Sequence, residues 1–261
     1  MKSSFTIKVS KPLSEGEAKP EAMVGDAEGN WKPTDKIIWA RMHVENDIKE
    51  LEEIFNPYKE YFSTGRIKNI RYKLYALRYE KEAYIKAEEE KEREYKKGFQ
   101  PGLGMEFTES NLRALYRVES FLFQAKSTLD IMSLILKDKI QNYTFEGFGK
   151  SCDENNEELA GQKIIKELKK IDSEHDFEPL IKLIKDNQSW LTELVKERDK
   201  IAHNTSIQAL WFVELTYKGG DYLEIVYPHM PNDIRIKEYL ELVERRLHIF
   251  VQNFLSLVSK F

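Results

Sequence analysis

The segment "ERDKIAHN", residues 197–204, places an arginine and a histidine five residues apart at the end of an apolar helical run. Leu191 and Leu194 belong to the apolar side of that run, and Arg198 follows Leu191 by seven residues. At about 100° per residue, Arg198 is expected near the middle of the apolar stripe. A guanidinium keeps its charge there, so it needs an anion, a carbonyl or a wet cleft. The position therefore suits a residue that binds an anionic group.

Asp199 and His203 stand four residues apart in the same segment, so on a helix they are neighbours. The carboxylate can accept a hydrogen bond from one imidazole nitrogen and orient the other, which prepares a histidine for proton transfer. Arg198 and His203, however, lie about 140° apart around one helix and do not converge on one small ligand. Either the helix ends near Ile201, or a second chain completes the site.

A structural interpretation of the same residues is also open. An arginine at the C-terminal end of a helix interacts favourably with the helix dipole and can bind the last carbonyl groups. A histidine beside it can act as a second cap. From the residues alone, the catalytic and the capping interpretations carry similar weight.

Composition places the chain among globular proteins with a sizeable core: 261 residues are 41% hydrophobic and 33% charged. The formal net charge of -4 confines any contact with nucleic acid to a local surface. Cys152 is the single cysteine, so no internal disulfide can form. The first residues carry no apolar signal segment, and no apolar run approaches the roughly 20 residues of a membrane span. These features predict a cytoplasmic protein without membrane contact.

Four helices are expected to position the motif within residues 105–261. Two are long, each with apolar residues at steps of three and four, from Leu115 to Leu136 and from Ile236 to Phe261. Asn232 or Asp233 is expected to cap the latter. A shorter helix is predicted around residues 157–171 and another from about Pro179 to His203. Four such helices predict an antiparallel bundle, and thus a mainly all-α fold.

A β-hairpin is predicted at about residues 209–228, inserted between the last two helices. Its sequence, "LWFVELTYKGGDYLEIVYP", alternates on both sides of Gly219-Gly220, which allow a tight turn. Because the hairpin follows the motif directly, it could gate the cleft, widen an interface between two chains or occlude the site.

Residues 1–104 are expected to form an N-terminal extension that ends in the glycine cluster from Gly98 to Gly104. It begins with an irregular or weakly β leader over residues 1–33, which includes the strand-like piece "SFTIKV". One helix is predicted from Thr34 to about Pro57 and a second over residues 64–98, both packed on the bundle.

Residues 61–79 within this extension interleave cations with tyrosines. Basic groups there could bind phosphates and tyrosines could stack on bases, but the cations spread around the helix axis. We therefore expect an ordinary solvated helix whose tyrosines pack on the bundle. The cations are Arg66, Lys68, Arg71, Lys73 and Arg78, and the tyrosines are Tyr61, Tyr72, Tyr75 and Tyr79.

"RDKIAH" matches the pattern R-x4-H with a polar residue directly after the arginine. It lies late in a helical bundle, and over residues 107–261 the chain resembles the HEPN superfamily (higher eukaryotes and prokaryotes nucleotide-binding). Many HEPN proteins are metal-independent endoribonucleases that act as homodimers, with the Arg and His of two chains facing one cleft. The resemblance implies that His203 moves the proton of a ribose 2′-OH or of the leaving 5′-oxygen. It implies that Arg198 holds the scissile phosphate.

The resemblance implies RNA as the substrate and requires no metal or other cofactor, because the nucleophile is already in the substrate. The five histidines are scattered, and "SEHDFE" at residues 173–178 is interpreted as a loop and helix cap, with Asp176 ahead of the helix. Around the catalytic residues Arg198, Asp199 and His203, further residues are expected to contact the substrate. They are Lys200, Asn204, Arg66 and Arg71.

One position departs from the family pattern. Toxins of the family that pair with a nucleotidyltransferase antitoxin often continue as R-x4-H-x-Y, whereas this chain has Thr205. The function expected is that of a toxin or phage-defence ribonuclease, with an antitoxin or another protein as a partner. The alternative is a catalytically silent HEPN module that binds nucleotide, RNA or a protein.

Overall fold

The structure is a computed structural model of the chain, which divides into two compact units, residues 1–50 and 51–261. In the first unit it describes the antiparallel strands β1 (Val24–Gly25) and β2 (Trp31–Lys32). The predicted strand "SFTIKV" and most of the helix predicted from Thr34 lie outside the described residues. The described residues are 24–25, 31–32, 55–58, 64–98, 109–145, 147–171, 175–203, 212–217, 221–230 and 232–261.

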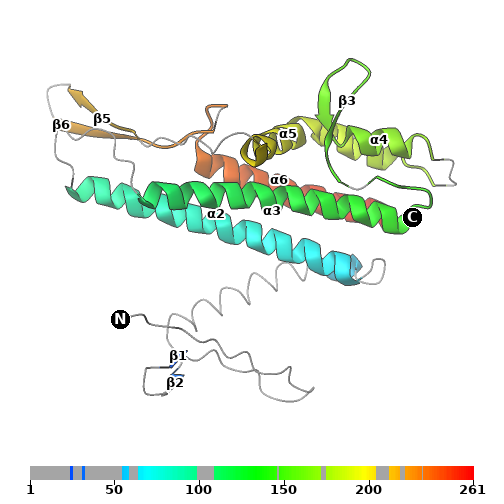
Figure 1. Cartoon of the computed structure of the whole chain (residues 1–261), viewed down its shortest axis with the longest axis horizontal. Coiled ribbons are helices and arrows are strands. Elements are labelled where there is room, and N and C mark those ends of the chain that lie inside the picture. The colour runs from blue at the N-terminus through cyan, green and yellow to red at the C-terminus, as the bar shows by residue number, and fades with distance from the viewer. Residues whose placement is uncertain are drawn as a thin grey trace. The chain divides into compact units, whose positions relative to one another are not determined.

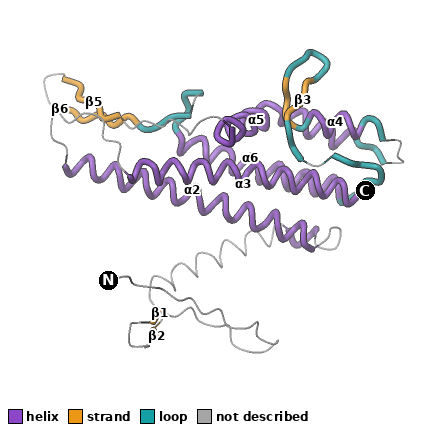
Figure 2. Tube along the Cα trace, viewed as in Figure 1, coloured by secondary structure: helices purple, strands orange, loops and turns teal. Residues whose placement is uncertain are grey.

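The second unit is mainly helical, as the sequence predicted (Figure 1). Its strands are short and form separate two-stranded hairpins (Figure 2). The first described residues of this unit are the buried Phe55 and the short 3-10 helix η1 (Asn56–Tyr58). Its α-helices, among the described residues, are α2 (Thr64–Gly98), α3 (Glu109–Lys139), α4 (Gln162–Leu168), α5 (Glu178–His203) and α6 (Ile236–Val258).

The helices α2 and α3 run antiparallel along their length, with α6 behind α3 in the view of Figure 1. Two hydrogen bonds set their register: Lys73 Nζ donates to Gln124 Oε1 at 3.0 Å, and Arg117 Nη1 donates to Glu80 Oε2 at 2.9 Å. The helix α5 packs on α3 and α6. The helix over residues 64–98, expected within an extension of residues 1–104, thus lies in the same compact unit as the bundle helices.

The predicted apolar stripes form the core. On α3, the residues at steps of three and four from Val118 to Leu136 are buried, and Leu115 packs against them half-buried. On α6, the seam from Ile236 to Phe254 is buried in the same way. Periodicity predicted these faces correctly because a stripe this wide can leave water only against other helices.

A hairpin replaces the first part of the helix predicted around residues 157–171. The strand β4 (Glu158–Ala160) pairs with β3 (Lys150–Cys152), and α4 begins only at Gln162. The backbone N–H of Ala160 donates to Thr192 Oγ1 of α5 at 3.0 Å. The helix prediction was wrong at residues 158–160, because cross-strand and tertiary hydrogen bonds there satisfy the backbone groups.

The predicted hairpin between the last two helices is confirmed. The strands β5 (Phe212–Tyr217) and β6 (Asp221–Val226) pair antiparallel from Phe212↔Val226 to Tyr217↔Asp221. Residues 218–220, which contain the Gly-Gly pair, lie outside the described residues.

The N-cap predicted for α6 is wrong: Arg235 occupies the cap position, without a side-chain cap hydrogen bond. Its guanidinium forms an ion pair with Glu88 of α2, which is 1% exposed, and its Cζ lies 3.5 Å from the centroid of the Tyr227 ring. The N–H of Ile236 is bonded to the carbonyl of Pro228 instead. A buried carboxylate needs a cation, and this tertiary requirement sets the start of α6.

No helix in the described part of the chain is both long and apolar enough to cross a membrane.

Candidate functional site

The helix α5 carries the motif and continues through His203. It therefore does not end near Ile201. Of the two expected ways for Arg198 and His203 to face one ligand, only completion of the site by a second chain remains. The side chain of His203 and the whole of Asn204 lie outside the described part of the structure. The predicted pair between Asp199 and His203 stays a prediction.

Arg198 lies at the margin of the core, with 20% of its side chain exposed. Its Nη1 is 3.1 Å from Asp199 Oδ1, so the adjacent carboxylate supplies the anion that the sequence required. Its Nε is buried and has no hydrogen-bond partner among the described residues. This donor is therefore a buried polar group whose hydrogen bond is not supplied by the described residues.

Lys126 on α3 is the charged residue that sequence reasoning missed. It is 6% exposed and forms an ion pair with Asp130, one turn further along the helix. Burial lowers the pKa of Lys126; Asp130 opposes that effect, and the nearby charge of Arg198 lowers the pKa further. The available signal was that Lys126 and Asp130 are the charged residues of an otherwise uncharged stretch from Ser120 to Leu136.

Lys150 reaches the motif from β3, with its Nζ 3.9 Å from Asp199 Oδ2. Its position follows from the preceding loop, because the N–H of Phe148 donates to Asp130 Oδ1 at 2.7 Å. The buried Phe148 ring also meets Phe250 edge to face, with centroids 5.9 Å apart. The loop is thus fixed to both α3 and α6, and β3 leaves it toward α5.

These contacts define a group that we call the Arg198 cluster: Lys126, Asp130, Lys150, Arg198 and Asp199. Lys150 Nζ is also 3.5 Å from Glu158 Oε2, so its charge is shared with an exposed carboxylate. In the partly buried part of the cluster, Lys126 and Arg198 face Asp130 and Asp199. The low local dielectric strengthens a charge-assisted hydrogen bond to an anion there. Charged donors of this kind are the groups that bind phosphates in proteins.

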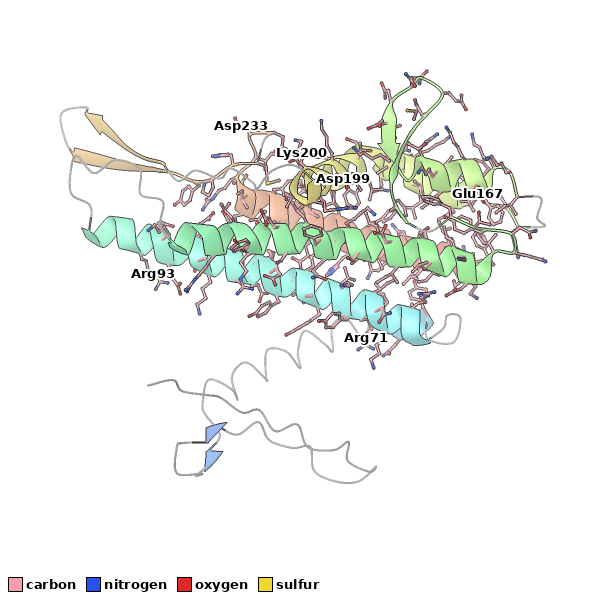
Figure 3. The ribbon with its side chains drawn as sticks, in the orientation of Figure 1. Arg71, Arg93, Glu167, Asp199, Lys200 and Asp233 are labelled. Atoms are coloured by element: carbon pink, nitrogen blue, oxygen red, sulfur yellow. The ribbon has the colours of Figure 1, made fainter. Side chains whose placement is uncertain are left out.

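The other predicted contact residues lie elsewhere. Lys200 Nζ bonds to Glu197 Oε1 at 2.7 Å, and Arg66 Nε bonds to Asp138 Oδ2 at 2.9 Å in the seam between α2 and α3. Arg71 lies on α2, on the far side of α3 from Asp199 and Lys200 in the view of Figure 3. Of the predicted site residues with described side chains, only Arg198 and Asp199 therefore belong to the cluster.

A groove of about 400 Å³ lies between α2 and α6, apart from the motif. One of its lining residues, Glu244, is bound by Arg78 and Lys81 of α2. The groove is lined by Arg78, Lys81, Glu82, Glu244, Arg245, His248 and Ile249. Across the part of the chain that the structure describes, no group of three or more His, Cys, Asp or Glu side chains is arranged to hold a metal ion.

Comparison with known proteins gives no match: no family model, no curated protein and no solved structure matches this chain significantly.

Proposed function

We propose that the protein is a metal-independent endoribonuclease of the HEPN type, with a composite site at the interface of a homodimer. The observation that carries the proposal is the guanidinium of Arg198, partly buried near Lys126, with a buried Nε that has no hydrogen-bond partner among the described residues. This guanidinium belongs to an R-x4-H segment at the end of a bundle helix. A toxin or phage-defence effector acting in the cytoplasm is the biological role that fits such an activity.

In the proposed reaction the ribose 2′-oxygen attacks the adjacent phosphorus, and the bond from phosphorus to the 5′-oxygen breaks. His203 takes the proton of the 2′-OH or gives one to the leaving 5′-oxygen. Arg198 holds the phosphate and stabilises the charge that develops on it. Asp199 orients the imidazole. The products are a 2′,3′-cyclic phosphate and a free 5′-OH.

A second chain enters the proposal because α5 is continuous through His203. On one continuous helix Arg198 and His203 point about 140° apart. Two copies of α5 facing each other across a two-fold axis would let the arginine and the histidine of both chains line one cleft.

The test is RNA cleavage by the wild type and by His203→Ala, Arg198→Ala and Asp199→Ala. Loss of a general acid or base typically lowers the rate about 10²–10⁴-fold. Loss of a charge-stabilising donor lowers it about 10²–10³-fold. We expect His203→Ala and Arg198→Ala to abolish cleavage and Asp199→Ala to weaken it.

Chemistry of the products separates this mechanism from a metal-dependent one. Cleavage should survive EDTA and leave a 2′,3′-cyclic phosphate or a 3′-phosphate, and a 2′-deoxyribose at the cleavage position should block it. Cleavage that requires added Mg²⁺, or that persists in His203→Ala, would contradict the role of His203.

A catalytically silent module that binds nucleotide, RNA or a protein is the second candidate. The observation that favours it is that Asp199 of the same chain already pairs with Arg198, as in a purely structural ion pair. In that case the wild type cleaves no RNA, and the main effect of Arg198→Ala is a lower melting temperature.

A further inference from the structure

Exposed aromatic residues gather on α2 and α3. Tyr72 and Tyr79 of α2 are 64% and 53% exposed, and Tyr116 and Phe123 of α3 are 63% and 41% exposed. On each helix the two residues are seven positions apart, so they form one stripe. The expectation that tyrosines of this segment pack on the bundle holds for Tyr75 but is wrong for Tyr72 and Tyr79.

Both stripes lie on the same side of the helix pair. The register bonds put Lys73 beside Gln124 and Arg117 beside Glu80 in the seam. Helical geometry places the aromatic residues on the side of that seam opposite to the buried side, which α6 covers. In Figure 1 this is the side of α2 and α3 turned away from α6. We call the four aromatic side chains and the cations beside them the aromatic face.

The register also places the rings in two rows across the helix pair. Tyr79 lies close to the level of Tyr116, and Tyr72 close to the level of Phe123. Because an α-helix rises 1.5 Å per residue, the two rows are about 10 Å apart. One strand of a duplex rises about 3.4 Å along the helix axis per nucleotide. The distance between rows thus corresponds to about three nucleotides of a stacked strand.

Cations accompany the rings. Lys73 Nζ lies 5.9 Å from the centroid of the Tyr72 ring, and Arg117 Cζ reaches across from α3 to lie 5.7 Å from that of Tyr79. Helical spacing puts two more cations, Lys68 and Arg113, on the same side. The acids on the same side include Glu119, Glu80 and Asp130, of which Glu80 is bound by Arg117 and Asp130 by Lys126. The aromatic face is therefore locally basic on a chain whose net charge is -4.

We propose that the aromatic face binds single-stranded nucleic acid, with bases stacked on the rings and phosphates bound by the flanking cations. Alternating aromatic rings and cations are the features that single-strand binding surfaces share. The face also leads to the Arg198 cluster, because Lys126 follows Phe123 by one turn of α3. This inference rests on the proposed function only in naming RNA as the natural single strand.

A protein partner fits this face less well. The cores of protein interfaces are depleted of lysine, and Lys73 would lose its hydration there without gaining a carboxylate. A phosphate backbone supplies an anion to Lys73. A duplex fits less well too, because its bases are already stacked and paired.

The test measures binding of a fluorescein-labelled single-stranded DNA of about 12 nucleotides by fluorescence anisotropy at low salt. DNA lacks the 2′-OH, so binding is read without cleavage. We expect the full chain to bind, and Tyr79→Ala and Phe123→Ala each to weaken binding roughly 5- to 100-fold, which is the usual contribution of one stacked base. Tyr79→Phe keeps the ring and should bind as the wild type does.

The matched control is Ile249→Ala, since Ile249 is another exposed large apolar residue, 52% exposed on α6. It should leave DNA binding unchanged. Absence of binding by the wild type, or wild-type binding by both alanine variants, overturns the proposal. The proposal is also overturned if the aromatic variants bind DNA normally but change the molecular mass measured by light scattering. The face would then be a protein interface.

The outcomes for the two proposals are separable. If the aromatic variants lose DNA binding while the wild type cleaves no RNA, the aromatic face stands and the ribonuclease assignment fails. If RNA cleavage is lost in His203→Ala but the aromatic variants bind DNA normally, the ribonuclease assignment stands and the aromatic face fails.

Discussion

At the scale of single residues, the Arg198 cluster joins a helix-end motif to a charge that comes from another helix. Burial lowers the pKa of Lys126, and the ion pair with Asp130 keeps its ammonium form in place. The adjacent Arg198 adds a second positive charge in the same partly buried region. Asp130 and Asp199 already pair with these two cations, so a phosphate at the cluster would bind as a further hydrogen-bond acceptor.

The electrostatic coupling within the cluster can be measured directly. In an NMR titration of the lysine side chains, Lys126 should have a pKa below the ordinary lysine value. Arg198→Gln removes a like charge and should raise that pKa, whereas Asp130→Asn removes the stabilising carboxylate and should lower it further. Arg113→Gln serves as the control, since Arg113 lies thirteen residues away on α3, about 20 Å, and charges beyond about 10 Å are screened. Equal pKa values for Lys126 in all variants would contradict the cluster.

At the scale of elements, Arg78, Lys81 and Glu244 form ion pairs that join α2 to α6, and we call them the ion-pair clasp. Glu244 of α6 is bound by Arg78 Nε at 3.0 Å and by Lys81 Nζ at 2.6 Å, and about 10% of its side chain is exposed. Burial by itself would raise the pKa of Glu244, but the bonds from Lys81 and Arg78 outweigh burial and hold it below its usual range. The carboxylate is therefore charged in the fold and holds the two helices together.

Removing this carboxylate should destabilise the protein in a pH-dependent way. Glu244→Gln leaves two partly buried cations without their anion, so we expect a loss of about 1–3 kcal/mol in the free energy of unfolding near pH 7. Because the folded pKa is depressed, the stabilisation is present above the unfolded pKa of about 4.3 and is lost as pH falls through the folded value.

Urea unfolding of wild type and Glu244→Gln at pH 7 and at successive lower pH values measures this difference. It should be largest at pH 7 and should shrink below about pH 4. Glu241→Gln, an exposed position on the same helix, is the matched control and should change stability by less than about 0.5 kcal/mol. A difference that grows as pH falls would contradict the ion-pair clasp.

At the scale of the whole molecule, the proposed mechanism depends on how many chains form one active site. On one continuous α5 the positions of Arg198 and His203 lie about 140° apart around the axis, so the proposed chemistry requires a two-fold pair. We expect size-exclusion chromatography with light scattering to give a dimer at micromolar concentration. A monomer under these conditions would leave the R-x4-H segment without its second half and would favour the silent module.

The sequence by itself determined the elements whose evidence is local. The apolar stripes of α3 and α6, the extent of α5 from Glu178 to His203 and the hairpin β5–β6 followed from periods of 3.6 and 2 and from a Gly-Gly turn. Such signals depend on neighbours within a few turns, so they can be recognised without knowing the fold. The same count along α5 predicted Arg198 near the middle of the apolar stripe, whereas it lies at the margin of the core, with 20% of its side chain exposed.

Only the tertiary structure decided which residues join Arg198 and which surface stays open. Lys126 and Lys150 come from α3 and β3, far along the chain, and no spacing in the sequence reveals that they approach α5. The strand β4 and the start of α6 were mispredicted, because their backbone groups are bound by β3, Thr192 and the segment around Pro228 and not by local caps. The exposure of Tyr72 and Tyr79 likewise depends on which side of α2 the other helices cover. These are long-range contacts, and their energies are set by burial and pairing that exist only after the chain has folded.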